Sequence, residues 1–262
     1  MDADLELTLI AAPEQVQAAR RRGLPVACLA YRVGGGGHLF RSRQPAVPPG
    51  GLLALDDLGT DGRADPAVFC REVLDECLAR RASGVYCAFR DRTPPPLRQG
   101  AARLAEALAR RGLPLYVPEA LGDVGPHVRP LISSALSGGS LEQRLREAAD
   151  RFGPDRTVLR AERTAVDFRL PSPTGQGTAL SREALEALLR EQVPAVFFSP
   201  ELCARYFTYR TGPEGVHFVL FDDAGSLRQK LRTAARLGLR RAFLDYAETA
   251  DLLDEVIPPA GP

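Results

Sequence analysis

Charged and polar residues recur in this sequence where short apolar runs end. They are Asp56, Asp57, Arg90, Asp91, Glu119, Glu162, Asp245 and Tyr246. If the runs are parallel strands, these side chains meet at one edge of the sheet, where barrel enzymes place their sites. Two carboxylates that flank a glycosidic bond can hydrolyse it, and Glu119 with Asp57 or Asp245 is the available pair. The alternative is that one of these carboxylates forms an ion pair with Arg90. A neighbouring arginine lowers the pKa of a carboxyl group, and a carboxyl group with a lowered pKa is a poor general acid.

The other reactive residue types lack the spacing that metal or disulfide chemistry needs. The cysteines are Cys28, Cys70, Cys77, Cys87 and Cys203, and the histidines are His38, His127 and His217. The number of cysteines is odd and the histidines are scattered, whereas structural zinc needs four converging ligands. We therefore predict no metal, no cofactor and no disulfide framework, and we expect reduced thiols in a cytoplasmic protein.

The composition argues against several classes of partner. The net charge is +1 over 262 residues, without the basic excess of nucleic-acid-binding proteins. No apolar run reaches the about 18 residues of a membrane span, and the acidic start lacks the positive segment of a secretory signal. Tryptophan is absent and aromatic residues make up 6%, so few side chains can stack against sugar rings. The remaining candidate partner is a carbohydrate or a small anionic ligand; the oligomeric state stays open.

Apolar runs and amphipathic stretches alternate along the chain. Strands are predicted over residues 5–11, 25–31, 52–55, 84–89, 113–117, 128–134, 157–170, 216–221 and 241–246, and helices over 13–23, 66–81, 97–111, 140–152, 181–191 and 225–237. Strands that are apolar on both faces and separated by helices indicate a parallel sheet. The predicted fold class is α/β, a closed parallel (β/α)8 TIM barrel, with a doubly wound open sheet as the alternative. We expect a single domain over 1–257 and a disordered tail over 258–262.

The C-terminal part of the chain contains several spaced features in a characteristic order. They are Tyr206-Phe207-Thr208-Tyr209, the strand and helix start from His217 to Lys230, the helix end from Ala235 to Leu239, and the strand from Arg241 to Tyr246. In this order they resemble the last third of glycoside hydrolase family 18, in particular bacterial chitinases and enzymes of the spore-cortex and germination type. The resemblance implies the same barrel, with Asp223 and Ser226 at a helix N-terminus and Lys230 one turn later.

The resemblance also implies that the fourth barrel strand carries the family motif D-G-x-D-x-D-x-E. The final Glu of the motif is the general acid, and the Asp before it orients the N-acetyl group of the substrate. The aligned acidic positions in this chain are Ser83, Tyr86, Ala88 and Arg90. Arginine cannot donate a proton at neutral pH, and alanine cannot orient an amide. The Tyr and Asp of the family's sixth strand and the Trp of its last strand are missing as well.

Three functions follow from this pattern. The first is a pseudoenzyme, a chitinase-like barrel that has lost glycosidase activity and serves carbohydrate-related binding or scaffolding. Its ligand-binding candidates are Asp57, Tyr86, Arg90, Glu119, Asp245 and Tyr246. The second is an active hydrolase of glycosidic bonds that uses relocated carboxylates, Glu119 with Asp57 or Asp245. The third is an interaction module in which Arg90 and Tyr86 block the barrel mouth. An open pocket would instead favour ligand binding, and Arg90 would then favour an anionic ligand.

Overall fold

Eight parallel strands form a closed barrel in the computed structural model, which describes residues 5–42, 47–171, 175–212 and 215–257. In order around the barrel they are β1 (Glu6–Ala11), β2 (Val26–Val33), β4 (Leu52–Asp56), β5 (Val85–Ala88), β6 (Leu115–Pro118), β7 (Val128–Ser133), β8 (Val158–Ala161) and β14 (Arg241–Asp245). Strand β1 pairs with both β14 and β2, so the sheet closes on itself. The predicted closed barrel is confirmed, and the open-sheet alternative is wrong. The predicted tail, 258–262, lies outside the described residues.

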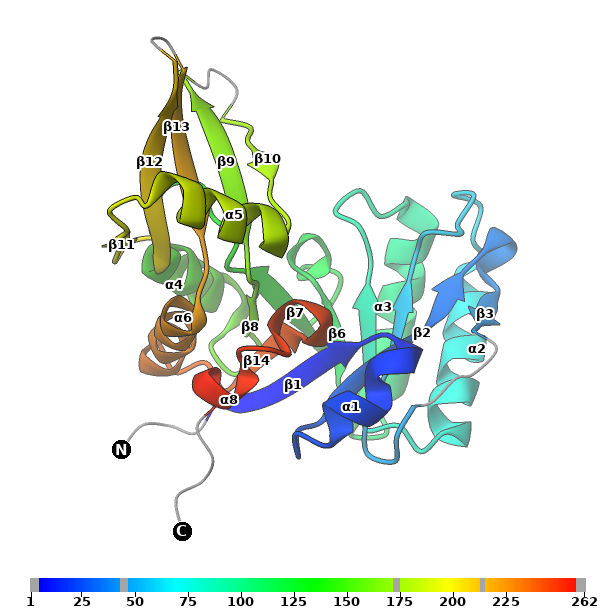
Figure 1. Cartoon of the computed structure of the whole chain (residues 1–262). Helices are drawn as coiled ribbons and strands as arrows, with labels where there is room; N and C mark the ends of the chain where they lie inside the picture. Colours follow the sequence, from blue (N-terminus) through cyan, green and yellow to red (C-terminus); the bar gives the residue numbers. More distant parts are fainter. Residues whose placement is uncertain (1–4, 43–46, 172–174, 213–214, 258–262) are drawn as a thin grey trace.

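Helices cover the outside of the barrel (Figure 1). They are α1 (Val16–Arg20), α2 (Pro66–Ala79), α3 (Pro95–Ala109), α4 (Leu141–Phe152) and α6 (Ala224–Arg236), with the short α7 (Tyr246–Thr249) and α8 (Leu253–Val256) after β14. Shorter elements are η1 (Pro13–Gln15), η2 (Gly35–Gly37), η3 (Glu119–Leu121) and β3 (Leu39–Arg41), which pairs antiparallel with β2. The side chains of Asp65, Ser140 and Asp223 cap α2, α4 and α6 by accepting hydrogen bonds from first-turn N–H groups. Within the described ranges, no helix is both long and apolar enough to cross a membrane.

The interior of the barrel is filled by inward-pointing side chains. They are Ile10, Ala27, Leu52, Ala54, Tyr86, Tyr116, Leu131, Val158 and Phe243. The rings of Tyr86 and Tyr116 contact Phe243, with centroids 5.5 and 4.9 Å apart. A second, larger layer of buried residues lies between the strands and the helices. Because residues alternate between these two layers along each strand, nearly every strand residue is apolar.

A second sheet is inserted between β8 and α6 and rises beside the barrel (Figure 1). It is antiparallel, in the order β10 (Thr178–Ala179), β9 (Ala165–Leu170), β13 (Gly215–Phe221), β12 (Ala204–Thr211) and β11 (Phe197–Ser199), and α5 (Arg182–Gln192) packs on one face. The stretch over 157–170, predicted as a strand that runs into a hairpin arm, is two strands that belong to two sheets. It divides into β8 in the barrel and β9 in the inserted sheet, since the chain leaves one sheet for the other at residues 162–164.

A buried ion pair ties the inserted sheet to the barrel. Asp222 follows β13, and its Oδ2 accepts hydrogen bonds from Lys230 Nζ at 2.7 Å and from both N and Oγ1 of Thr164 at 2.9 Å. Its Oδ1 accepts a hydrogen bond from Ser226 Oγ at 2.7 Å. Asp223 caps α6 together with Ser226, as the resemblance implies. These hydrogen bonds fix the positions of β9, β13 and α6 relative to one another where the chain leaves β8.

Candidate functional site

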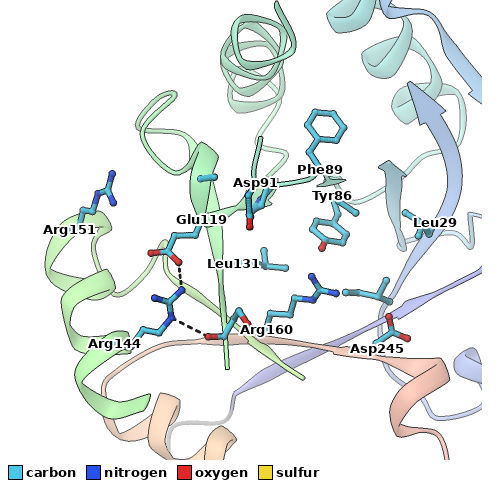
Figure 2. Close-up of a pocket in the computed structure, with 15 residues that line it drawn as sticks. Leu29, Tyr86, Phe89, Asp91, Glu119, Leu131, Arg144, Arg151, Arg160 and Asp245 are labelled. Carbon is cyan, nitrogen blue, oxygen red and sulfur yellow. Dashed lines mark hydrogen bonds and ion pairs between the residues drawn. The ribbon is translucent and has the colours of Figure 1, made fainter. Parts of the chain in front are cut away.

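A cavity of about 540 Å³ opens at the carboxyl ends of the barrel strands (Figure 2). Its apolar lining includes Ile10, Leu29, Ala88 and Leu131, and its polar lining consists of Tyr86, Asp91, Glu119, Ser133, Arg144, Arg151, Arg160 and Asp245. This volume lies within the usual range for small-molecule sites. The mouth is therefore open, which argues against the interaction module with a blocked mouth.

Strand β5 is the fourth strand of the barrel, and it presents Tyr86 and Ala88 to this cavity. Tyr86 packs edge-on against Phe243 and is only 3% exposed. Burial raises its pKa, so the side chain stays a neutral phenol. Neither side chain offers a carboxylate to a ligand in the cavity.

Arg90 lies two residues beyond Ala88 but does not line the cavity. Its backbone N–H and its Nε donate to Asp57 Oδ1 at 3.3 and 3.2 Å, and its Nη2 donates to the Asp57 carbonyl oxygen at 3.2 Å. Asp57 is fully buried, and its Oδ2 accepts no hydrogen bond from the described residues. The ion pair of Arg90 with a carboxylate is thus present, yet it leaves the mouth open.

Helix α4 contributes two arginines to one wall of the cavity. Arg144 Nη2 donates to Glu119 Oε2 at 2.6 Å, and Arg144 Nε donates to the Ser133 carbonyl oxygen at 3.3 Å. Arg151 lies two turns later, with its guanidinium over the ring of Phe152 at 4.7 Å, and pairs with no carboxylate of the described residues. Glu119 is thus held in place by a charge-assisted hydrogen bond.

Strand β8 places Arg160 in the middle of the cavity. In Figure 2 its guanidinium lies between Tyr86, Leu131 and Asp245. Its nearest carboxylate oxygen is Glu162 Oε1, 3.5 Å from Nε, and Ser133 Oγ donates a short hydrogen bond to the other oxygen of Glu162. Arg160 Nε is buried and has no hydrogen-bond partner among the described residues.

Asp245 ends β14 and faces the same cavity. Its Oδ1 accepts a hydrogen bond from the N–H of Ala247 at 3.0 Å, which caps α7. Burial raises the pKa of this carboxyl, against the opposing effects of that hydrogen bond and of the Arg160 charge. A raised pKa is the direction that a general acid requires. The next residue, Tyr246, packs against the outer core and not into the cavity.

The cavity brings together half of the predicted ligand-binding residues. Tyr86, Glu119 and Asp245 line it, whereas Asp57, Arg90 and Tyr246 do not. The strand-end residue Asp91 also lines it. Three lining arginines, Arg144, Arg151 and Arg160, are absent from the predicted set. A usable signal existed for two of them, since Arg144 and Arg151 are seven residues apart on a predicted helix and share one face.

The charged groups of the cavity do not form a metal centre. Among the described residues, no group of three or more His, Cys, Asp or Glu could hold a metal ion. None of the five cysteines forms a disulfide. The arginines and carboxylates of the mouth instead offer hydrogen bonds and charge to a polar organic ligand.

No protein-family model and no curated protein sequence matches the chain. Solved structures match over almost its whole length. The spore cortex-lytic enzyme SleL of Bacillus megaterium is 15% identical, with a TM-score of 0.68 over 97% of this chain and 74% of SleL. A chitinase of Chromobacterium violaceum is 16% identical, with a TM-score of 0.69 over 97% and 99%. A glycoside hydrolase family 18 N-acetylglucosaminidase of Paenibacillus barengoltzii is 13% identical, with a TM-score of 0.69 over 97% and 99%.

These likenesses agree with the resemblance that the C-terminal features carry. At such low identity they show the fold and leave the activity open. They also agree with the position of β5 as the fourth barrel strand, the place where the resemblance puts the family motif. The chain has the closed barrel fold of this spore cortex-lytic enzyme, this chitinase and this glycoside hydrolase family 18 N-acetylglucosaminidase.

Proposed function

We propose that this protein binds a carbohydrate in its barrel mouth and does not hydrolyse it by the chemistry of family 18. Strand β5 is the observation that carries this proposal. It presents Tyr86 and Ala88 to the cavity, while Arg90 is bound to Asp57 outside it. The strand therefore supplies neither a carboxylic acid as proton donor nor a carboxylate to orient an N-acetyl group. A cavity with a ligand's volume remains at the mouth.

The lining of the cavity supports a sugar as the ligand. Leu29, Ala88 and Leu131 offer an apolar patch to the C–H face of a ring. Ser133, Asp91 and the arginines surround this patch with donors and acceptors for hydroxyl groups. Since the chain contains no tryptophan, hydrogen bonds supply more of the affinity than ring stacking does.

A hydrolase with relocated carboxylates is the second candidate, and one observation favours it. Asp245 combines a place in the cavity with a pKa that burial raises. Its partner would be Glu119, because Asp57 does not line the cavity. Glu119 forms an ion pair with Arg144, and a hydrolytic pair needs a second carboxyl group beside the acid.

The test measures binding and turnover on the same samples. Purified protein is titrated with N-acetylglucosamine oligosaccharides and with peptidoglycan fragments by calorimetry, and the mixtures are then analysed for shorter products. We expect binding without products. If neither ligand binds, the proposal fails.

Product formation would also contradict the proposal, and variants then identify its source. Loss of turnover in both Asp245→Asn and Glu119→Gln would establish the relocated pair. Asp155→Asn is the matched control, because Asp155 is an exposed carboxylate that does not line the cavity.

We also propose that the protein works in the cytoplasm. The five cysteines without a disulfide support this location, since secreted proteins commonly oxidise theirs. Fractionation of cells of the source organism tests it, and recovery of the protein outside the cytoplasmic fraction would contradict it.

A further inference from the structure

Arg160 leaves its hydrogen-bonding capacity unused in the centre of the mouth. A guanidinium carries five N–H donors, and none of those of Arg160 has an acceptor among the described residues. Its Nε is buried as well. A buried donor without an acceptor costs free energy, and native proteins usually satisfy such groups with a partner or an ordered water. The guanidinium is therefore placed for an acceptor that comes from outside the chain.

The neighbouring carboxylates do not fill this role. Glu162 Oε1 is 3.5 Å from Arg160 Nε, longer than the about 2.7–2.9 Å of a charge-assisted hydrogen bond. The other oxygen of Glu162 already accepts from Ser133. Asp245 is held by the N–H of Ala247 and forms no ion pair with Arg160. The positive charge of Arg160 is thus only partly compensated.

Arg144, which reaches the cavity from helix α4, is by contrast hydrogen-bonded within the chain. It donates to Glu119 at 2.6 Å and to a backbone carbonyl oxygen at 3.3 Å. Arg151, two turns later on the same helix, pairs with no carboxylate of the described residues. Two of the three cavity arginines, Arg151 and Arg160, consequently remain available to an anion.

We propose that Arg160 binds a carboxylate of the ligand, so that the carbohydrate taken by this barrel is an acidic one. This inference rests on the proposed function. The planar fork of arginine matches a carboxylate with two parallel hydrogen bonds, which a neutral sugar cannot offer. Two kinds of sugar carry that group: a uronic acid has it on the ring, and an amino sugar with a lactyl ether has it on a side arm. Arg151 provides a second cation toward the rim.

Three disaccharides of equal size test the inference by calorimetry. One is neutral, made of two N-acetylglucosamines; one joins N-acetylglucosamine to N-acetylmuramic acid; and one joins N-acetylglucosamine to glucuronic acid. We expect at least one acidic disaccharide to bind about tenfold tighter than the neutral one, which corresponds to about 1.4 kcal/mol. The acidic disaccharide that binds more tightly shows whether the carboxylate bound by Arg160 belongs to a lactyl ether or to a sugar ring.

Variants assign the preference to Arg160. Arg160→Gln abolishes the preference, so that the acidic and neutral disaccharides bind with similar affinity, whereas Arg160→Lys keeps the charge, loses the fork and retains part of the preference. Arg146→Gln is the matched control, because Arg146 lies on α4, outside the cavity, and its loss removes the same charge. If Arg160→Gln does not fold, the affinities of Arg160→Lys alone test whether Arg160 is responsible for the preference.

The failures of the two proposals are distinguishable. Equal binding of all three disaccharides by the unmodified protein would overturn the inference and leave the carbohydrate-binding function standing. An acid preference that is undiminished in both Arg160 variants would overturn the assignment to Arg160. Absence of binding to all three would overturn the inference and the proposed function together.

Discussion

Two charged sites, one at the junction of the sheets and one at the barrel mouth, differ in how fully their groups are paired. At the junction, Asp222 accepts four hydrogen bonds, including one from Lys230, whose side chain is 1% exposed. At the mouth, Arg160 donates none to the described residues. A complete set of partners within the chain is what a scaffold requires, because it leaves no polar group to solvent or ligand. An arginine without acceptors is what a binding site requires.

A third site is intermediate between these two. Asp57 is fully buried and holds Arg90 through Oδ1, while Oδ2 has no hydrogen-bond partner among the described residues. The Arg90 side chain is 59% exposed, so solvent screens this pair more than the junction pair. We therefore rank the three sites by their contribution to folding: the junction, then Asp57 with Arg90, then Arg160.

Removal of Lys230 should have the largest effect on stability. Lys230→Met leaves the buried Asp222 carboxylate without its cation, and the free energy of unfolding should fall by about 3–5 kcal/mol. Urea unfolding measures this. The control is Arg240→Gln, which breaks an ion pair between two exposed side chains and should cost less than about 0.5 kcal/mol. Similar losses in both variants would show that the junction pair is no stronger than a surface pair.

Removal of Arg90 should have an intermediate effect. Arg90→Gln takes away the cation beside the buried Asp57, and a loss of about 1–3 kcal/mol is expected for a buried group that loses a charged hydrogen-bond partner. Arg90→Lys should recover part of it. Because Arg90 does not line the cavity, ligand affinity should be unchanged in the folded variant. A changed affinity would place Arg90 in the site after all.

Removal of Arg160 should hardly affect folding. Arg160→Met keeps most of the side-chain volume and deletes donors that have no acceptor among the described residues, so the free energy of unfolding should change by less than about 1 kcal/mol. Thermal and urea unfolding of this variant beside Lys230→Met give a direct contrast. A loss as large as that of Lys230→Met would make Arg160 part of the scaffold.

The pH dependence of Asp245 is the smallest expected effect. Burial raises its pKa in the folded protein above the value in the unfolded chain. Between these two values the folded state binds more protons, so stability falls as the pH rises. The contribution is fully present below the unfolded pKa of about 3.9 and is lost as the pH passes the folded value. Asp245→Asn preserves the helix cap.

Urea unfolding of both proteins across the acidic range measures this contribution. The stability of the unmodified protein relative to Asp245→Asn should increase as the pH falls. A constant difference between the two would mean that the carboxyl of Asp245 is not perturbed.

Much of the barrel could be predicted because its strands lie between two apolar layers. Each parallel strand is a short apolar run followed by a polar residue, and that pattern is local. The inserted sheet could be predicted less well from the sequence. Residues 157–170 read as one extended stretch, but a hydrogen bond from Thr164 to Asp222, 58 residues away, marks the point where β8 ends and β9 begins another sheet. Such a partner is invisible in a local pattern.

The candidate site divides in the same way. Glu119 and Asp245 could be predicted because each lies at the end of a barrel strand and therefore reaches the mouth. Arg90 and Arg160 both lie at strand ends, yet Arg90 turns to Asp57 while Arg160 points into the cavity. Arg144 and Arg151 reach the cavity from a helix, which a rule about strand ends cannot include.

The amino-acid sequence by itself determined the chemistry that strand β5 lacks. Residue identity decides whether a carboxyl group is present, and Tyr86, Ala88 and Arg90 contain none. Only the tertiary structure decided which charges face a ligand. The direction of a long arginine side chain depends on the partners that other segments bring to it. In the part of the chain that the structure describes, folding brought Asp57 to Arg90 but no hydrogen-bond acceptor to Arg160.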